Sequence, residues 1–595
     1  MAENKDMENY RATSAEEEED YFDNVELELD YSISVTEGSV ELKKDSIKEQ
    51  KKYMRDSHGD MDDEEFLQNM QLVNNDEAYL TRAAKRLEVY EHQKKNPYFG
   101  KVTFRYDDEG DVIPFYIGMA GYESDMNNEQ LIYDWRAPVS SMYYAYEKGP
   151  ASYTVNTEDM GSEKFTGHII EKKQFVIVNG KLREAVDTDA NINDVILLEA
   201  LGGNSSVKMK SVVATIQKEQ DAIIRNRTAY NLIVDGRAGS GKTVIAMHRL
   251  AWLLYNYKTL DSDKVMILSP NSIFGDYISD VLPELEENSV PEKEFDSLLE
   301  ELLYIDEEYE TKLEQSEFII DSGDQENQRI RNLKVKSSIG FYDRFNEFLE
   351  RYVSEIKFRT FHYQKVEYTG DDISAMFNGR FSRKPVYERF ENIAYFIVDR
   401  VEDNSPKEFP EEKKNNLARQ IQKQMVNLFA ERNLVKLYVD FLAEMEPEYP
   451  GISEYKNEYG KICYEDILPI LYLQVYFYGC NTYNNIKHLV IDEMQDYTIF
   501  QYAILDRIFG CKKTILGDRY QVLFYNPEET VVDILTKIFA KRNGQGGYEL
   551  MELSESYRST AEITEFCNNI LGDEGIGGNT VERHGRVPEE IQCGS

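Results

Sequence analysis

The stretch NLIVDGRAGSGKTVIAMHRLAWLLY, residues 231–255, decides the fold of this chain. Within it, GRAGSGKT (236–243) fits the phosphate-binding pattern G-x-x-x-x-G-K-[ST] in full. The glycines let backbone N–H groups curl around phosphate oxygens, Lys242 supplies charge at the β and γ phosphates, and Thr243 offers a hydroxyl to Mg²⁺. Because the pattern follows an apolar run and opens a helical one, it predicts a strand, a loop and a helix that bind a nucleotide.

A second candidate element is the segment HLVIDEMQD (488–496). Three apolar residues place Asp492 at the carboxyl end of a buried strand, where its carboxylate can complete a Mg²⁺ shell, while Glu493 can orient an attacking water. A strand that merely ends in an acidic turn would look the same. The phosphate-binding pattern upstream and LGDRYQ (516–521) downstream favour the nucleotide interpretation. We therefore expect a nucleotide-binding site that uses Mg²⁺.

Short motifs stand in a fixed order along residues 216–560: IQKEQ (216–220), GRAGSGKT, DEMQD (492–496), LGDRYQ and SESYRST (554–560). In order and spacing they resemble the UvrD/Rep branch of superfamily 1 helicases. The resemblance implies that Gln220 reads adenine and that Gln521 senses the γ-phosphate. It also implies that Tyr557 stacks on the adenine and that Arg558 reaches the γ-phosphate as an arginine finger.

The resemblance gives a set of candidate site residues in three roles. The candidate catalytic residues are Lys242, Glu493, Gln521 and Arg558. The candidate nucleotide-binding residues are Gln220, Gly236, Arg237, Ala238, Gly239, Ser240, Gly241, Lys242, Thr243 and Tyr557. The candidate metal ligands are Thr243 and Asp492.

Five segments resemble HelD-like proteins, and one of them includes the IQKEQ motif. They are NPYFGKVTF (96–104), YIGMAGY (116–122), LIYDWRAPVSSMYYAY (131–146), VVATIQKEQDAIIRN (212–226) and SPNSIFGDYISDVLPELEE (269–287). This resemblance implies an N-terminal helical arm that enters the secondary channel of bacterial RNA polymerase. It also implies a helical insertion that grips the polymerase from the DNA-channel side, with ATP driving release and recycling. For DWRAP itself we expect a packing role in a β-domain.

The fold class that follows is α/β, with a RecA-like P-loop NTPase core and an incomplete second RecA-like domain. We expect an N-terminal helical hairpin arm with an acidic tip (1–96), a small β-rich domain (97–206), the first RecA-like domain in two parts (207–282 and 461–547), a helical insertion (283–460) and the start of the second RecA-like domain (548–595). The insertion carries charged helices with little strand signal, so we expect it to form its own lobe.

The arm is predicted from two helical segments joined by an acidic turn, DSHGDMDDEE (56–65). The first is clearest at VELKKDSIKEQKKYMRD (40–56), and the run EEEED (16–20) before it is typical of a solvated tail. In the second, an apolar stripe recurs at three- and four-residue steps with one slip. Its members are Phe66, Met70, Val73, Leu80, Ala84 and Leu87. Further on, Asn179-Gly180 predicts a β-hairpin.

The composition sets limits on partners and location. The net charge is −42, from 110 acidic and 68 basic residues, so the chain repels phosphate backbones except at local sites and suits a basic protein surface. Solubility alone would explain the charge equally well. The five cysteines show no zinc spacing, and no apolar run is long enough to span a membrane. From the polar start MAENKDMENY we expect no signal peptide, and we expect a monomer in the cytoplasm.

Two departures from the helicase pattern leave three functions open. Asn526 stands where the branch has a base-stacking tryptophan. The chain also ends at IQCGS (591–595), before the remaining motifs of the second RecA-like domain, so we expect a truncated chain. The leading interpretation is an RNA polymerase recycling ATPase. The alternatives are a UvrD/Rep-like DNA helicase or translocase, and a polymerase-binding fragment that does not cycle ATP.

Overall fold

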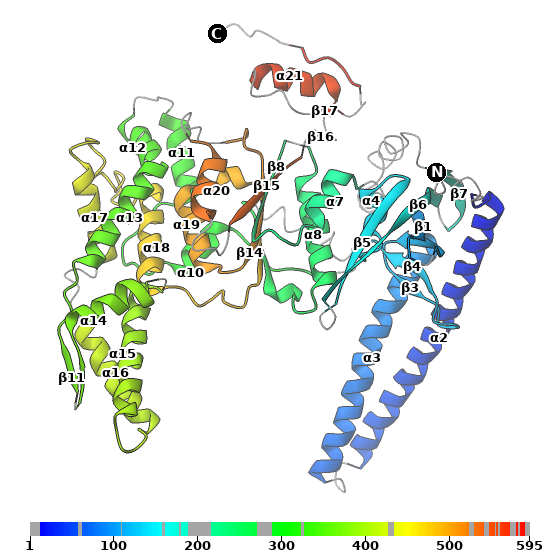
Figure 1. Cartoon of the computed structure of the whole chain (residues 1–595), viewed down its shortest axis with the longest axis horizontal. Coiled ribbons are helices and arrows are strands. Elements are labelled where there is room, and N and C mark those ends of the chain that lie inside the picture. Colours follow the sequence, from blue (N-terminus) through cyan, green and yellow to red (C-terminus); the bar gives the residue numbers. More distant parts are fainter. Residues whose placement is uncertain are drawn as a thin grey trace.

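The structure is a computed structural model (Figure 1). It describes residues 12–57, 62–108, 110–157, 161–177, 180–187, 216–237, 239–270, 288–322, 327–363, 365–382, 384–426, 433–522, 529–540, 547–553, 555–556, 560–571, 579–580 and 584–589. A helical hairpin and a β-sheet domain lie at one end of the long axis, a parallel sheet lies in the middle, and a helical region lies at the other end (Figure 1).

The arm consists of two long helices, α2 (Ala15–Asp56) and α3 (Asp63–Lys95), which lie side by side (Figure 1). The run EEEED is not a solvated tail but the first turn and a half of α2. Ser14 caps this helix, because its hydroxyl accepts from the Glu17 N–H while Glu17 reaches back to the Ser14 N–H. Acidic side chains in a first turn also suit the helix dipole.

The buried face of α3 differs from the predicted apolar stripe. Val73 is buried as expected, but Met70 is 44% exposed and Ala84 is exposed, whereas Ala83 and Tyr90 are buried. The reason is that α3 packs on α2 and, through Tyr90 and Gln93, on the β-sheet domain, and the buried residues are those that face these partners.

The root of the arm is joined to the β-sheet domain through a buried ion cluster. The fully buried Glu18 carboxylate accepts from the ammonium groups of Lys101 at 2.7 Å and Lys173 at 2.9 Å. Glu171 pairs with the same two lysines, at 3.1 and 3.2 Å, and accepts from the Thr13 N–H at 2.9 Å. Because each buried charge has opposite partners, the cluster holds α2 against the sheet.

The β-sheet domain is a largely antiparallel sheet in the order β3-β4-β2-β1-β6-β5, with β7 also paired to β6. Its elements are β1 (Gly100–Tyr106), β2 (Val112–Gly118), β3 (Tyr122–Glu123), β4 (Gln130–Asp134), α4 (Ser141–Ala145), β5 (Gly149–Thr157), β6 (Gly161–Ile177) and β7 (Leu182–Asp187). β6 and β7 pair antiparallel across the predicted hairpin, and Gly180 has the positive φ of 68° that such a turn requires.

The central sheet has six parallel strands in the order β10-β9-β13-β14-β8-β15. They are β8 (Asn231–Gly236), β9 (Val265–Leu268), β10 (Glu292–Lys293), β13 (His488–Ile491), β14 (Lys512–Gly517) and β15 (Tyr548–Leu553). The associated helices are α7 (Lys218–Ile224), α8 (Lys242–Asn256), α19 (Ile499–Ile508) and α20 (Val531–Phe539). β15 pairs along its whole length with β8, so the domain boundary expected between 547 and 548 falls inside this sheet.

The helical region is mostly α-helix, as expected, with one short hairpin, β11 (Phe361–Tyr363) and β12 (Val366–Tyr368). Its helices are α10 (Phe295–Leu302), α11 (Lys312–Ser322), α12 (Gln328–Lys336), α13 (Ile339–Ser354), α14 (Gly370–Ala375), η2 (Met376–Arg380), α15 (Val386–Asp403), α16 (Glu411–Val426), α17 (Leu434–Met445) and α18 (Tyr464–Tyr478). It is not a separate lobe. Its side chains form one apolar cluster with Met266, Leu268 and Ile491 of the central sheet.

Beyond β15 the structure describes the short strands β16 (Glu555–Ser556) and β17 (Asn579–Thr580) and the helix α21 (Ala561–Leu571). Within the described ranges, we find no helix that combines the length and the apolar character that a bilayer crossing requires.

Candidate functional site

The phosphate-binding loop lies between the buried strand β8, which ends at Gly236, and α8, which begins at Lys242. Gly239 and Gly241 have φ angles of 80° and 82°, which side chains disfavour. A Cβ atom on Gly236 would lie 2.5 Å from the Ser240 hydroxyl oxygen. The loop therefore curls tightly at the amino end of a 15-residue helix, where free N–H groups and the helix dipole bind anions.

Lys242 lies inside the curve of this loop. Its ammonium group donates to the carbonyl oxygens of Gly236 at 2.7 Å and Arg237 at 3.2 Å, and the side chain is half-buried. The positive charge is thus held at the place where the loop can surround phosphate oxygens.

The two candidate metal ligands lie together. The Thr243 hydroxyl donates to the Asp492 carboxylate at 3.2 Å, and Asp492 follows directly on β13. The other carboxylate oxygen of Asp492 is buried and has no hydrogen-bond partner within the described part of the chain. Burial, with the nearby charge of Glu493, raises the pKa of Asp492 to about 6. A hydroxyl beside a buried, under-coordinated carboxylate oxygen fits Mg²⁺, which prefers hard oxygen ligands.

Glu493 is connected to the downstream motif by a chain of hydrogen bonds. Its backbone adopts φ 51°, uncommon for a non-glycine residue and characteristic of functional turns. The Gln495 amide donates to the Glu493 carboxylate at 2.7 Å and accepts from the Asp518 N–H at 3.0 Å. The Gln521 amide in turn donates to the Asp518 carboxylate at 3.0 Å. Gln495 lies inside DEMQD and Asp518 inside LGDRYQ, yet the motifs alone predicted no role for either residue.

Arg519 ties together the carboxyl ends of three strands. Its N–H donates to the Asp235 carboxylate at 3.0 Å, and its guanidinium pairs with Asp235 and with Glu552 of β15. Asp235 lies directly before Gly236, so the ion pairs connect the loop to the strand that leads toward Tyr557 and Arg558. The role of Arg519 could not be predicted, because nothing in the sequence indicates that β8 pairs with β15.

Gln220 lies on the short helix α7. Its amide oxygen accepts from the Gln217 N–H at 3.2 Å and so caps its own helix. The carboxyl end of α7 is held by Arg249 of α8, whose guanidinium donates to the carbonyls of Ile223 at 2.7 Å and Ile224 at 3.1 Å. The structure therefore fixes α7 against the helix that follows the phosphate-binding loop.

Some predicted site residues lie outside the described residues. These are Ala238, Tyr557 and Arg558, together with Asn526 at the tryptophan position. Arg237 is described: its guanidinium lies over the Tyr520 ring, 5.5 Å from the centroid, and donates to the Asn568 side chain of α21. The loop thus contacts the segment beyond β15.

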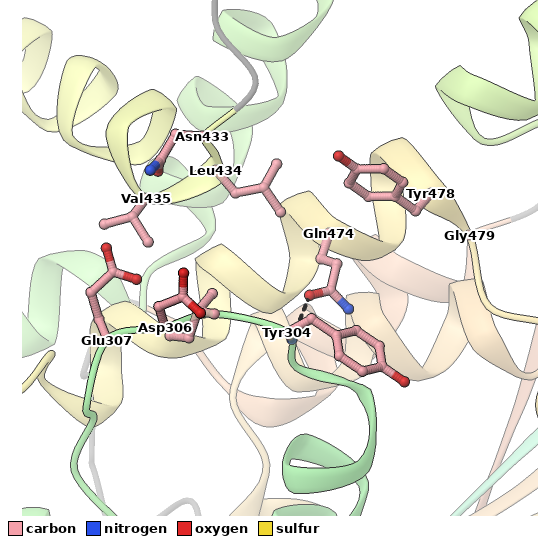
Figure 2. A pocket seen from close by; sticks show the side chains of 10 residues that line it. Tyr304, Asp306, Glu307, Asn433, Leu434, Val435, Gln474, Tyr478 and Gly479 are labelled. Carbon is pink, nitrogen blue, oxygen red and sulfur yellow. Dashed lines mark hydrogen bonds between the residues drawn. The ribbon is translucent and has the colours of Figure 1, made fainter.

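A cavity of about 500 Å³ lies elsewhere, in the helical region, where side chains of α17 and α18 face the chain that follows α10 (Figure 2). The Gln474 amide oxygen on its wall accepts from the Tyr304 N–H at 2.9 Å. None of the candidate site residues lines it. The assignment of the nucleotide site thus depends on the loop and the strand ends, not on this cavity.

Comparisons with known proteins agree with this geometry. Residues 15–196 match the N-terminal domain of DNA helicase IV HelD, and residues 216–526 match the UvrD/REP helicase N-terminal domain. The comparison with curated proteins found no match. The second match covers more than half of the chain and contains Gln220, the phosphate-binding loop, Asp492 and Gln521. The chain therefore belongs to the UvrD/REP helicase family, whose members are ATP-hydrolysing motors, and it carries a HelD-type N-terminal domain.

Proposed function

We propose that this protein is an ATP-driven motor that binds bacterial RNA polymerase and helps release it from nucleic acid. The observation that supports this most directly is the combination of a HelD-type N-terminal domain, with its long helical hairpin, and a UvrD-type ATPase domain in one chain. We propose that the hairpin enters the polymerase and that the helical region contacts it from another side. The net charge of −42 suits a basic protein surface.

For the ATPase site, we propose one role for each group of residues. The loop 236–243 binds the phosphates, with Lys242 at the β and γ phosphates. Thr243 and Asp492 hold Mg²⁺, which neutralises phosphate charge. Glu493 orients the attacking water. Gln521 contacts the γ-phosphate, and the hydrogen bonds through Asp518 and Gln495 couple this contact to Glu493.

Three further residues belong to this proposed site. Gln220 and Tyr557 bind the adenine, one by hydrogen bonds and the other by stacking, and Arg558 acts as the arginine finger. Arginine fingers contribute about 10³–10⁵ in rate, so turnover depends on Arg558 being placed against the γ-phosphate.

A DNA helicase or translocase is the second candidate, favoured by the match to the UvrD/REP helicase N-terminal domain. Such an enzyme would bind single-stranded DNA with an affinity that falls steeply with salt. A third possibility, a polymerase-binding protein without ATP turnover, differs from both in its steady-state ATPase rate.

The experiment that separates these functions is co-purification with core RNA polymerase, in parallel with single-stranded DNA binding at two salt concentrations. We expect retention of polymerase, weak DNA binding and release of polymerase on addition of ATP. The Lys242→Ala variant should retain polymerase in the presence of ATP. Tight DNA binding without polymerase retention would instead establish the second candidate.

A further inference from the structure

Arg225 makes a buried contact between the two domains that neither the motifs nor the proposed catalytic roles explain. It follows α7 directly, and its side chain is 12% exposed. The guanidinium donates to the Asp221 carboxylate at 2.6 Å and to the carbonyl oxygens of Trp135 at 2.6 Å and Ala137 at 3.2 Å. A guanidinium with so little exposed surface destabilises the fold unless its charge and its N–H groups are paired.

The receiving loop, residues 134–138, is held by its own hydrogen bonds. The Asp134 carboxylate accepts from the Arg136 N–H at 2.7 Å and pairs with the Arg136 guanidinium at 2.7 Å. The Ser140 hydroxyl donates to the Asp134 carbonyl at 2.6 Å. This gives the DWRAP segment a physical role beyond packing, because the carbonyl oxygens of Trp135 and Ala137, with that of Arg136 at 3.5 Å, face one guanidinium.

α7 needs such external contacts. It has seven residues, and helices of this length are not stable alone in water. Arg249 holds its carboxyl end against α8, and Arg225 holds the same end against the β-sheet domain. Gln220 lies on this helix, so the place of its amide is set by these two contacts.

We propose that Arg225 is a positioning residue for nucleobase recognition: it holds α7, and with it Gln220, against residues 135–137, so that selection of adenine over guanine depends on a contact outside the ATPase fold. The inference rests on the proposed ATP site. A glutamine amide can donate to one acceptor of adenine and accept from its amino group, whereas guanine presents only acceptors on the same edge. Selectivity of this kind is lost when the amide moves.

The test measures a ratio of affinities, which a general loss of stability does not change. The variant D221N/R225Q removes the ion pair without leaving a buried charge unpaired. Dissociation constants of fluorescent ATP and GTP analogues are measured for this variant, for the wild type, for Q220A and for the triple variant Q220A/D221N/R225Q. The control is R227Q, which removes a neighbouring guanidinium that donates to Asn256 of α8 rather than to residues 135–137.

We expect D221N/R225Q to lower the preference for ATP over GTP by about tenfold, as the loss of one hydrogen bond to the base predicts. The triple variant should show the same preference as Q220A, and R227Q that of the wild type. If D221N/R225Q folds poorly, as judged by its thermal unfolding, R225K replaces it, because lysine keeps the charge beside Asp221 but cannot reach both carbonyls.

Three results would overturn the inference. The first is a preference for ATP over GTP that is unchanged in D221N/R225Q or R225K. The second is a triple variant whose preference falls below that of Q220A by as much as D221N/R225Q falls below the wild type, and the third is a wild type with no preference. A wild type without this preference would contradict the role of Arg225 but not the proposed ATP site. The proposed function fails separately, if Lys242→Ala binds ATP as tightly as the wild type.

Discussion

At the scale of single residues, Lys242 gives the simplest prediction. Lys242→Ala should abolish ATP binding because the charge at the β and γ phosphates is lost. The fold should survive, since the half-buried side chain makes two hydrogen bonds to loop carbonyls, whose loss costs about 1–3 kcal/mol. Titration with a fluorescent ATP analogue and a thermal unfolding curve test both statements. If Lys242→Ala binds the ATP analogue as tightly as the wild type, the loop does not bind the phosphates.

Glu493→Gln should separate binding from hydrolysis. The amide has the size of the carboxylate but cannot orient the water as a base, so ATP should stay bound while single-turnover hydrolysis slows by at least about 10²-fold. Gln495→Ala is the matched comparison, because it removes the hydrogen bond to Glu493 and spares the carboxylate. We expect a smaller loss there. If Glu493→Gln hydrolyses ATP at the wild-type rate, a group other than Glu493 orients the attacking water.

The site residues that could be predicted from sequence are those that act together with residues close to them in the chain. Gly236 to Thr243 form one loop, and Asp492 follows three apolar residues of one strand. Glu18 and Arg225 could not be found this way. The charge of Glu18 is matched by Lys101 and Lys173, which are distant in sequence. Arg225 pairs locally with Asp221, but the carbonyls of residues 135–137 that it also contacts are distant in sequence. A glutamate within EEEED carries no local sign of its burial.

At the scale of elements, the buried ion cluster should hold the amino end of α2 in place. Glu18→Gln leaves Lys101 and Lys173 with Glu171 as their shared carboxylate, and we expect a loss of about 3–5 kcal/mol in the docking of this end. Hydrogen exchange of residues 15–33 reports it. Glu19→Gln, at an exposed position of the same turn, should change nothing measurable. Equal protection in both variants would contradict the role of the cluster.

The same cluster predicts a pH dependence. Burial alone would raise the pKa of Glu171, but the nearby charge of Lys101, hydrogen bonds from Lys101 and Thr13, and the charge of Lys173 lower it from 4.5 to about 2. A lowered carboxyl pKa stabilises the folded state above 4.5, and this contribution is lost as the pH falls toward 2. Exchange protection of residues 15–33 should therefore decline over this interval, and Glu171→Gln should flatten the decline.

The helical region gives a prediction about deletion. Its apolar side chains share one cluster with Leu268 and Ile491, and α18 is buried along its length among α12, α15 and α17. Removing residues 283–460 would expose this surface, so we expect loss of cooperative unfolding and of ATP binding together. A folded deletion variant that still binds ATP would show that the region is an independent lobe. Sequence could not decide this, because periodicity reveals apolar faces and not their partners.

At the scale of the whole molecule, the proposed polymerase contact predicts a role for the acidic end of the hairpin. Asp62 caps α3 by accepting from the Glu65 N–H at 2.8 Å, and asparagine caps equally well. Changing Asp60, Asp62 and Asp63 to asparagine, of which Asp60 lies outside the described residues, should thus keep the helix. Polymerase binding should be weaker and less dependent on salt. An equal affinity and salt slope would leave capping as the only role of these carboxylates.

The length of the hairpin has a mechanical consequence. α3 alone has 33 residues and so extends about 50 Å. A tilt of about 6° where it meets the β-sheet domain would carry its far end about 5 Å, the rise of one helical turn. The two long helices therefore act as a lever that magnifies any movement at their base. The Glu18 cluster holds the base of this lever, so the stiffness of those few buried ion pairs limits how far the distant end moves.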